Sequence, residues 1–222
     1  MKKVKKKKLK VVKLILFLLI IYIIYLIGNA FLGSKINNIY IFNNNLLSDY
    51  TIIKQAKIKD YPSFFYTTKA SIKRRLMANP IIKEVKVKKS WGKKISITID
   101  EYKVLFKKNN KYVLENKEEI TSDLDISVPK LINYVPDLKY EKFISEMVKI
   151  DDDILNKVSE IEYKPNDLDK DRFLLYMTDK NLVYLTLTKY KNMNYYNEVL
   201  PQLEGKRGIL YLDSGNHFEI LE

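Results

Sequence analysis

His217 is the only histidine in the 222 residues of this chain, and cysteine is absent. A metal site that needs several histidines or thiolates is therefore excluded, and so is thiol catalysis. A Ser–His–Asp triad would depend on His217 alone, which lies in a polar segment where a surface position is expected. The sequence also contains neither a G-x-S-x-G nucleophile elbow nor a P-loop. These residue types favour a protein that is not an enzyme and that binds no cofactor and no metal.

The acidic residues are the remaining candidates for catalysis. Asp100, Glu101, Glu118 and Glu119 provide carboxylates of the kind that glycosidases use in pairs, but their spacing does not distinguish such a pair from a solvated surface. A membrane-anchored extracellular cell-wall hydrolase is the alternative function that they leave open. The acidic run 151–153 lacks the glycine and the terminal glutamate of a calcium loop, so a helix cap is expected there.

Trp91, the only tryptophan, is a candidate platform for a ligand. It lies in the polar segment Ser90–Lys93 between two runs of alternating residues, which is typical of a hairpin turn. A tryptophan at such a turn of a small domain is expected to pack over the edge of the sheet. The basic residues from Lys69 to Arg75 are expected to form the solvated face of a helix and not a phosphate site.

The longest apolar segment runs from Leu14 to Leu32, nineteen residues without a formal charge. As a helix it would measure roughly 28 Å, close to the thickness of the hydrocarbon core of a bilayer. The preceding thirteen residues carry eight lysines and no acid, and such charges stay on the cytoplasmic side. The sequence therefore predicts a basic cytoplasmic tail over 1–13, a transmembrane helix over 14–32 and extracytoplasmic domains after it.

A cleaved signal peptide is the alternative for this segment, because Gly28-Asn29-Ala30 resembles a small-residue cleavage site. The apolar core of a signal peptide usually has about 7–15 residues, fewer than are present here. We therefore expect the anchor to be retained.

The net charge of +13 does not indicate a nucleic-acid partner. Eight of the positive charges belong to the tail, and residues 14–222 carry 32 basic against 27 acidic residues, a net charge of +5. Lysines beside a membrane are attracted to anionic lipids by about 1 kcal/mol each, which accounts for the tail. Because cysteine is absent, the extracytoplasmic domains must be stable without disulfides.

The residues after the anchor predict a strand–helix–helix–strand–strand unit. A strand with Ile39 and Ile41 precedes two amphipathic helices, which Ser48 and then Thr67 or Thr68 are suited to cap. Two alternating runs on either side of the Trp91 turn predict a half-buried hairpin. The residues expected in the core of this unit are Ile52, Ile53, Ile72, Leu76, Val85, Val87, Ile95, Ile97 and Ile99.

From Val104 onward the pattern is mostly that of strands. Apolar runs predict short strands before residue 121, and 173–177 with 182–187 predict a second hairpin. Amphipathic helices are expected over 143–150 and in a segment that ends at Gly205. The predicted fold class is α+β, with a mostly β second domain.

The ordered string of motifs resembles the POTRA domain of the FtsQ/DivIB family of bacterial cell-division proteins. Ile39-x-Ile41 is followed by Leu47-Ser48, by Ile52-Ile53, by N-P-I-I-K-E-V-x-V-x-K-x-W over 79–91, and by Ile95-x-Ile97-x-Ile99-x-Glu101. The basic tail and the single span before it fit the same family. Gly92-Lys93 stands where the family commonly has Pro-Asn, and Lys103-Val104 replaces its usual Lys/Arg-Pro. Both departures fall in turns or at strand ends, so they lower the quality of the motif without changing the expected fold.

The resemblance implies a POTRA domain over 35–103 and a β domain over 104–222. It implies a non-enzymatic scaffold of the divisome, located in the cell membrane at the division septum. The implied partners are proteins of the FtsB/DivIC and FtsL types and, through them, the septal peptidoglycan synthase.

The resemblance also implies a partner site near the carboxyl end of the chain, where Asp213-Ser214-Gly215 matches a motif of the family. An apolar alternating run enters this motif, and a final strand is often an edge that a partner segment can extend. In the alternative interpretation, the apolar residues of this stretch only complete the core. The residues expected to bind the partner are Gly208, Ile209, Tyr211, Asp213, Ser214, Gly215 and Phe218.

Overall fold

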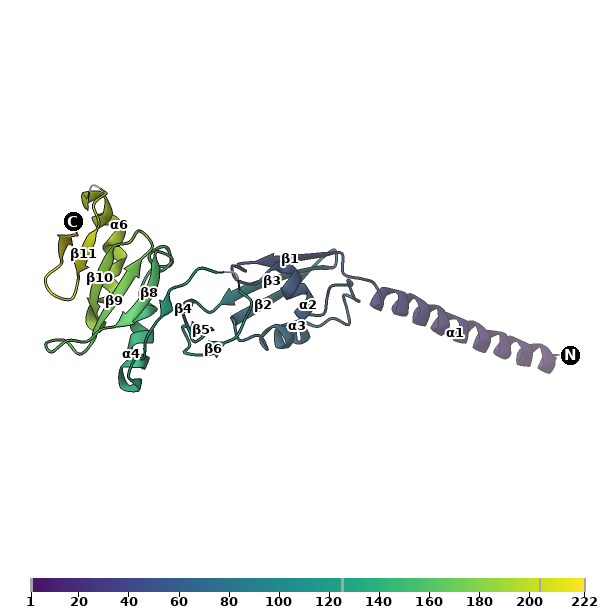
Figure 1. The fold of residues 1–222 in the computed structure, drawn as a ribbon. Helices are drawn as coiled ribbons and strands as arrows, with labels where there is room; N and C mark the ends of the chain where they lie inside the picture. The colour runs from purple at the N-terminus through teal and green to yellow at the C-terminus, as the bar shows by residue number, and fades with distance from the viewer. Residues whose placement is uncertain (1, 125, 204, 222) are drawn as a thin grey trace. The chain divides into compact units, whose positions relative to one another are not determined.

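A computed structural model describes residues 2–124, 126–203 and 205–221 of the chain, with side chains from residue 12 onward (Figure 1). Met1 and Glu222, the ends of the predicted tail and of the predicted β domain, lie outside the described residues. The chain divides into two compact units, and the boundary between them lies between Glu101 and Tyr102.

The first unit begins with the long helix α1, Lys2–Leu32. Its segment Val12–Leu32 has a mean hydropathy of 2.6, and none of that segment is buried inside the structure. By length and composition this helix can cross a membrane. Its apolar side chains are exposed on all sides, which is the expected state of a helix whose natural solvent is lipid.

A three-stranded sheet and two helices follow α1, in the predicted order. The elements are β1 Asn38–Phe42, α2 Asp49–Gln55, α3 Lys69–Leu76, β2 Ile82–Ser90 and β3 Lys94–Glu101. The strand order is β1-β3-β2, in which β1 runs parallel and β2 antiparallel to the central strand β3. Ser48 and Thr68 cap the two helices as predicted, because their hydroxyl oxygens accept hydrogen bonds from the backbone N–H groups of Thr51 and Ser71.

Alternation along β3 places its isoleucines in the core of the first unit. Ile95, Ile97 and Ile99 are buried, together with Ile52 of α2 and with Ile72 and Leu76 of α3. Two of the predicted core residues, Ile53 and Val87, are only half-buried. Val87 lies closer to the turn end of the edge strand β2 than Val85, which is buried on the same strand.

Trp91 does not pack over the sheet edge, and this expectation was wrong. Its side chain is 98% exposed at the tip of the β2–β3 turn. The last residue pair of the hairpin is Ser90–Lys94, and the chain then turns through positive φ angles at Gly92 and Lys93. Trp91 therefore lies beyond the last pair, where no neighbouring strand offers a surface for its ring.

The second unit is built on a nine-stranded sheet with the order β12-β11-β10-β9-β8-β7-β4-β5-β6. Neighbouring strands are antiparallel except in the pairs β4–β7, β7–β8 and β10–β11. The strands are β4 Val104–Lys108, β5 Lys111–Leu114, β6 Glu119–Ile120, β7 Lys130–Leu131, β8 Val158–Tyr163, β9 Arg172–Met177, β10 Leu182–Thr186, β11 Gly208–Tyr211 and β12 His217–Ile220.

The helices of the second unit pack against this sheet to form its core. They are α4 Asp137–Met147, α5 Asp152–Leu155, η1 Leu187–Tyr195, α6 Tyr196–Val199 and η2 Leu200–Leu203. Phe143 of α4 stacks on Phe173 of β9 with 4.8 Å between the ring centroids, and Tyr190 of η1 meets both rings edge-on. The run from η1 to η2 is the crossover that a parallel pair such as β10–β11 requires. The predicted α+β fold class, with an apolar helix before a mostly β region, is confirmed.

Candidate partner-binding edge of the second unit

The hairpin of β11 and β12 contains the predicted partner-binding residues. β11 is an inner strand, because it pairs with β10 on one side and with β12 on the other. β12 ends the sheet, and no described strand pairs with its outer side. Of the predicted partner-binding stretch, only the strand His217–Ile220 therefore lies at the edge of the sheet.

The hydrogen-bonding pattern shows which backbone groups of β12 point outward. The N–H of Leu221 donates to the carbonyl oxygen of Arg207, at 2.9 Å. Successive residues of a strand direct their N–H and C=O groups to opposite sides, so Glu219 and His217 face β11 as Leu221 does. The backbone groups of Phe218 and Ile220 consequently face the open edge.

The two faces of the hairpin separate the predicted residues into two sets. Phe218 lies opposite Leu210, and its side chain packs against the core, as the alternative interpretation expects, while its backbone groups face the open edge. Ile209 and Tyr211 alternate with Leu210, point to the other face of the sheet and are half-buried. Their part in binding a partner stays a prediction.

Gly208 is a glycine because the first residue of β11 has no room for a side chain. A Cβ atom there would lie 2.0 Å from the carbonyl oxygen of Glu219 and 2.6 Å from the ring of Phe218. The Phe218 ring thus covers the backbone of Gly208 from the diagonal position on β12. This close approach helps to fix the register of the edge strand.

Asn181, in the turn between β9 and β10, holds the start of β11 in place. Its side chain is 4% exposed, its oxygen accepts from the backbone N–H of Gly208 at 2.9 Å, and its NH₂ group donates to the Tyr196 hydroxyl at 3.1 Å. The Tyr196 hydroxyl in turn donates to the carboxylate of Asp179, at 2.8 Å. Burial, and after it this carboxylate, raise the pKa of Tyr196, so the hydroxyl keeps its proton.

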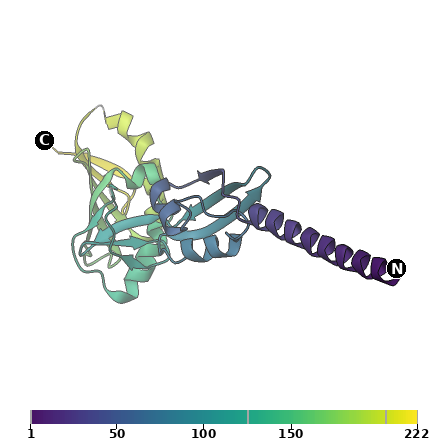
Figure 2. The same cartoon turned by 90° about the vertical axis from the view of Figure 1, so that its right-hand side faces the viewer.

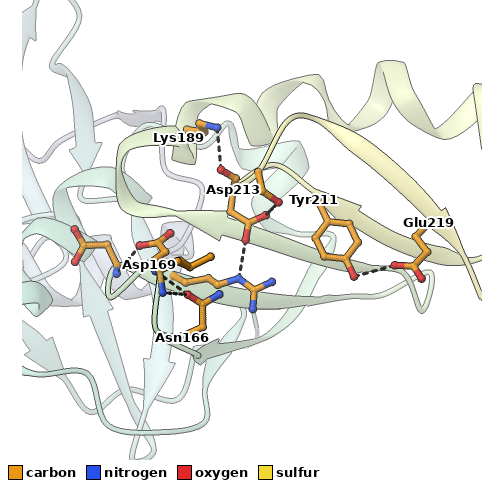
Figure 3. Close-up of polar contacts among 10 residues, drawn as sticks. Asn166, Asp169, Lys189, Tyr211, Asp213 and Glu219 are labelled. Carbon is orange, nitrogen blue, oxygen red and sulfur yellow. Dashed lines mark hydrogen bonds and ion pairs between the residues drawn. The ribbon is translucent and has the colours of Figure 1, made fainter.

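Asp213 is part of the framework of the hairpin and not of its free surface (Figure 3). Its carboxylate accepts from Nε of Arg172 at 2.6 Å, and the Asp213 side chain is only 7% exposed. Its carbonyl oxygen accepts from Lys189, and its backbone N–H donates to the carbonyl oxygen of Tyr184. The two residues that follow, Ser214 and Gly215, are exposed at the turn.

A row of aromatic rings crosses the outer face of the last three strands. Tyr184, Tyr211 and His217 lie opposite one another on β10, β11 and β12, with ring centroids 5.4 and 4.7 Å apart. The Arg172 guanidinium lies 3.5 Å from the centroid of the Tyr184 ring. The Tyr211 hydroxyl donates to Glu219 at 2.9 Å, which raises the pKa of Tyr211 and ties β11 to β12 (Figure 3).

Sequence reasoning did not find Arg172, Asn181 or Tyr184. Each of them lies more than 25 residues before its partner in the hairpin, and no local pattern signals such a contact. The hairpin predicted over 173–177 and 182–187 implies only that the polar segment 179–181 between these strands is a turn.

Two of the four carboxylates that could serve a hydrolase, Glu101 and Glu119, are engaged in the fold, whereas Asp100 and Glu118 are exposed. Glu101 accepts hydrogen bonds from the backbone N–H groups of three consecutive residues, 45–47, at 2.8, 2.8 and 3.0 Å. Glu119 pairs with Lys108 at 3.1 Å. Within the described residues, no group of three or more His, Cys, Asp or Glu side chains is placed to hold a metal ion. Asp151, Asp152 and Asp153 lie at the start of α5, where acidic side chains complement the helix dipole.

Comparisons with known proteins agree with this architecture. The family model described as "POTRA domain, FtsQ-type" matches residues 34–102. The cell division protein DivIB of Bacillus cytotoxicus is 30% identical over 199 residues, which cover 85% of this chain and 78% of that protein. DivIB of Bacillus subtilis is 28% identical over 195 residues, which cover 84% and 74%.

A solved structure, the major extracytoplasmic domain of DivIB from Geobacillus stearothermophilus, aligns with 47% of this chain at 19% identity and a TM-score of 0.38. The family assignment rests on the sequence relatives, since the match to the B. cytotoxicus protein spans most of both chains. This chain belongs to the FtsQ/DivIB family of bacterial cell-division proteins.

Proposed function

We propose that this protein is a non-enzymatic scaffold of the divisome. It binds division proteins of the FtsB/DivIC and FtsL types, and through them it is linked to the septal peptidoglycan synthase. Membership of the family supports a role in cell division, and the engaged state of Glu101 and Glu119 argues against a hydrolase.

The proposal includes the orientation of the chain in the membrane. The eight lysines before the apolar helix favour a cytoplasmic amino terminus, so both folded units lie outside the membrane, at the septum. A single helix then anchors a binding surface that other membrane proteins can reach.

The observation that carries the proposal is the open side of β12. Its outward N–H and C=O groups, on Phe218 and Ile220, match the ladder that an added strand needs. Ile220 is 52% exposed and Leu221 is 47% exposed, so an incoming strand would also cover apolar surface. We propose that a segment of the FtsB/DivIC-type partner pairs with β12.

The test compares two substitutions at one position in the full chain, co-purified from detergent with the FtsB/DivIC-type and FtsL-type proteins. Ile220→Pro removes an N–H group that points outward, and it is expected to abolish co-purification. Ile220→Ala keeps this N–H group and is expected to retain most of the binding. Circular dichroism of both variants checks that the second unit remains folded.

Equal binding by the Ile220→Pro and Ile220→Ala variants would exclude strand addition at β12. If the wild-type chain hydrolysed purified peptidoglycan, the scaffold hypothesis would be rejected in favour of the hydrolase hypothesis.

A further inference from the structure

The turn that carries Trp91 is tied to the end of α1 by a short connection. Asn37 donates its backbone N–H to the carbonyl oxygen of Lys93 at 3.0 Å, and its side chain donates to the carbonyl oxygen of Gly92 at 3.1 Å. Asn37 lies five residues after Leu32, where α1 ends, and five residues span at most about 18 Å. The turn and the end of α1 lie at the same end of the first unit (Figures 1 and 2).

A second loop, residues 62–67, contacts the same connection. The N–H of Phe64 donates to the carbonyl oxygen of Ser34 at 2.9 Å, and the Ser63 hydroxyl donates to that of Leu32 at 2.5 Å. The ring of Phe65 lies 4.5 Å from that of Phe31, in the last turn of α1. Lys89 joins this loop to the β2–β3 hairpin, because its ammonium group donates to the carbonyl oxygen of Thr67 at 2.9 Å.

We call residues 31–38, 62–69 and 88–94 the helix-proximal rim. The rim exposes two large amphipathic side chains, since Trp91 is 98% exposed and Tyr66 is 66% exposed. Its three segments contain six lysines and no acidic residue. The lysines are Lys35, Lys69, Lys88, Lys89, Lys93 and Lys94.

These side chains match the chemistry of a membrane surface. Tryptophan and tyrosine concentrate at the level of the lipid headgroups, where the ring contacts apolar chains and its polar atom stays hydrated. Lysines near an anionic surface are attracted to it, and acidic residues would oppose that attraction. The headgroup region on each side is about 5–8 Å thick. The rim contacts the last turn of α1 through Phe65 and Phe31, so its long side chains can reach this region.

We propose that the helix-proximal rim docks on the bilayer that α1 crosses, with Trp91 at the level of the headgroups and the lysines other than Lys89 against anionic lipid. The proposal rests on α1 as a membrane span. Docking gives the first unit a fixed orientation over the membrane, in addition to its tether. It also accounts for a tryptophan that is kept out of the core.

Trp91 is the only tryptophan of the chain, so its fluorescence reports on this position alone. The full chain is reconstituted into phosphatidylcholine vesicles with or without phosphatidylglycerol. In the anionic vesicles we expect emission at shorter wavelength, quenching by lipids brominated close to the headgroup, and protection from aqueous iodide. Each lysine near an anionic surface favours docking roughly fivefold, so Lys88→Glu with Lys94→Glu is expected to reverse these effects.

A matched control moves the probe to the second unit. Trp91→Phe with Leu168→Trp places the tryptophan at a position that is 98% exposed in a loop of that unit. In both kinds of vesicle, the fluorescence of this probe is expected to be quenched by iodide and not by the brominated lipids.

Two results would overturn the proposal while leaving the membrane span intact. Both results apply to vesicles that carry the protein on flotation. In the first, iodide quenches the fluorescence of Trp91 as strongly as that of the Leu168→Trp probe. In the second, Trp91 is protected from iodide, but brominated lipids do not quench its fluorescence. The second result would assign Trp91 to a contact between protein molecules. Failure of the protein to float with vesicles would overturn the span and the docking together.

Discussion

At Gly208 a single missing side chain lets the last two strands approach each other. The carbonyl oxygen of Glu219 occupies the space that a methyl group would need, and the Phe218 ring closes it from the side. The Glu219 carbonyl oxygen belongs to the backbone and cannot move away without displacing β12, whereas a flexible side chain could rotate to make room.

Gly208→Ala is therefore expected to destabilise the second unit by about 1–3 kcal/mol, as overpacking in a dense region does, and to displace β12. Urea unfolding of the detergent-solubilised chain, followed by circular dichroism, measures the loss. Adding Phe218→Ala is not expected to rescue the variant, because the tighter contact is with the Glu219 carbonyl oxygen. Full rescue by Phe218→Ala would show that the ring alone restricts this site.

The ion pair of Arg172 and Asp213 also shows what sequence can and cannot predict at the residue scale. The Asp213-Ser214-Gly215 motif is visible in the sequence, and the family resemblance predicts that all three residues contact a partner. In the structure the carboxylate of Asp213 is turned inward to Arg172, a residue 41 positions earlier. Only Ser214 and Gly215 of the motif remain exposed for a partner, and Gly215 has a φ of +101° that proline cannot adopt.

At the scale of single elements, the sequence predicted most of the first unit because its signals are local. The caps at Ser48 and Thr68 and the alternation along β3 act within a few residues. The parallel pairing of β1 with β3 and the order of the nine-stranded sheet depend on contacts between distant residues. No periodic pattern encodes these contacts. The expectation for Trp91 failed for a different, local reason, because the turn places this residue beyond the last pair of the hairpin.

A substitution at Ile97 tests the core of the first unit, whose residues the local patterns predicted. It lies on the central strand β3 and is fully buried, so Ile97→Ala is expected to cost about 2–5 kcal/mol of folding free energy. Val87 lies directly opposite Ile97 on the edge strand β2 and is half-buried, so Val87→Ala provides a milder control. Denaturant unfolding monitored by circular dichroism compares them, and equal losses would contradict the burial of Ile97.

For the whole molecule, charge and hydropathy along the chain predict one orientation in the membrane. Protease added to intact, wall-stripped cells is expected to remove both folded units, because the eight lysines before the apolar helix favour a cytoplasmic amino terminus and hence an outer location for the units that follow the helix. The fragment left in the membrane should begin with the lysine-rich tail. A mature chain that begins near Phe31 would show that the segment is a cleaved signal peptide.

The pairing of β1 with β3 has a consequence for how the chain folds as it is made. β1 is the first strand to emerge after the anchor, yet its partner residues lie 56 positions later, Asn38 being opposite Lys94. A contact of such sequence separation forms late, because the entropy of closing the loop must be offset first, whereas the local β2–β3 hairpin closes early. In the proposed topology, the first unit is therefore completed only after the β2–β3 hairpin has followed β1 across the membrane and β1 receives its partner strand.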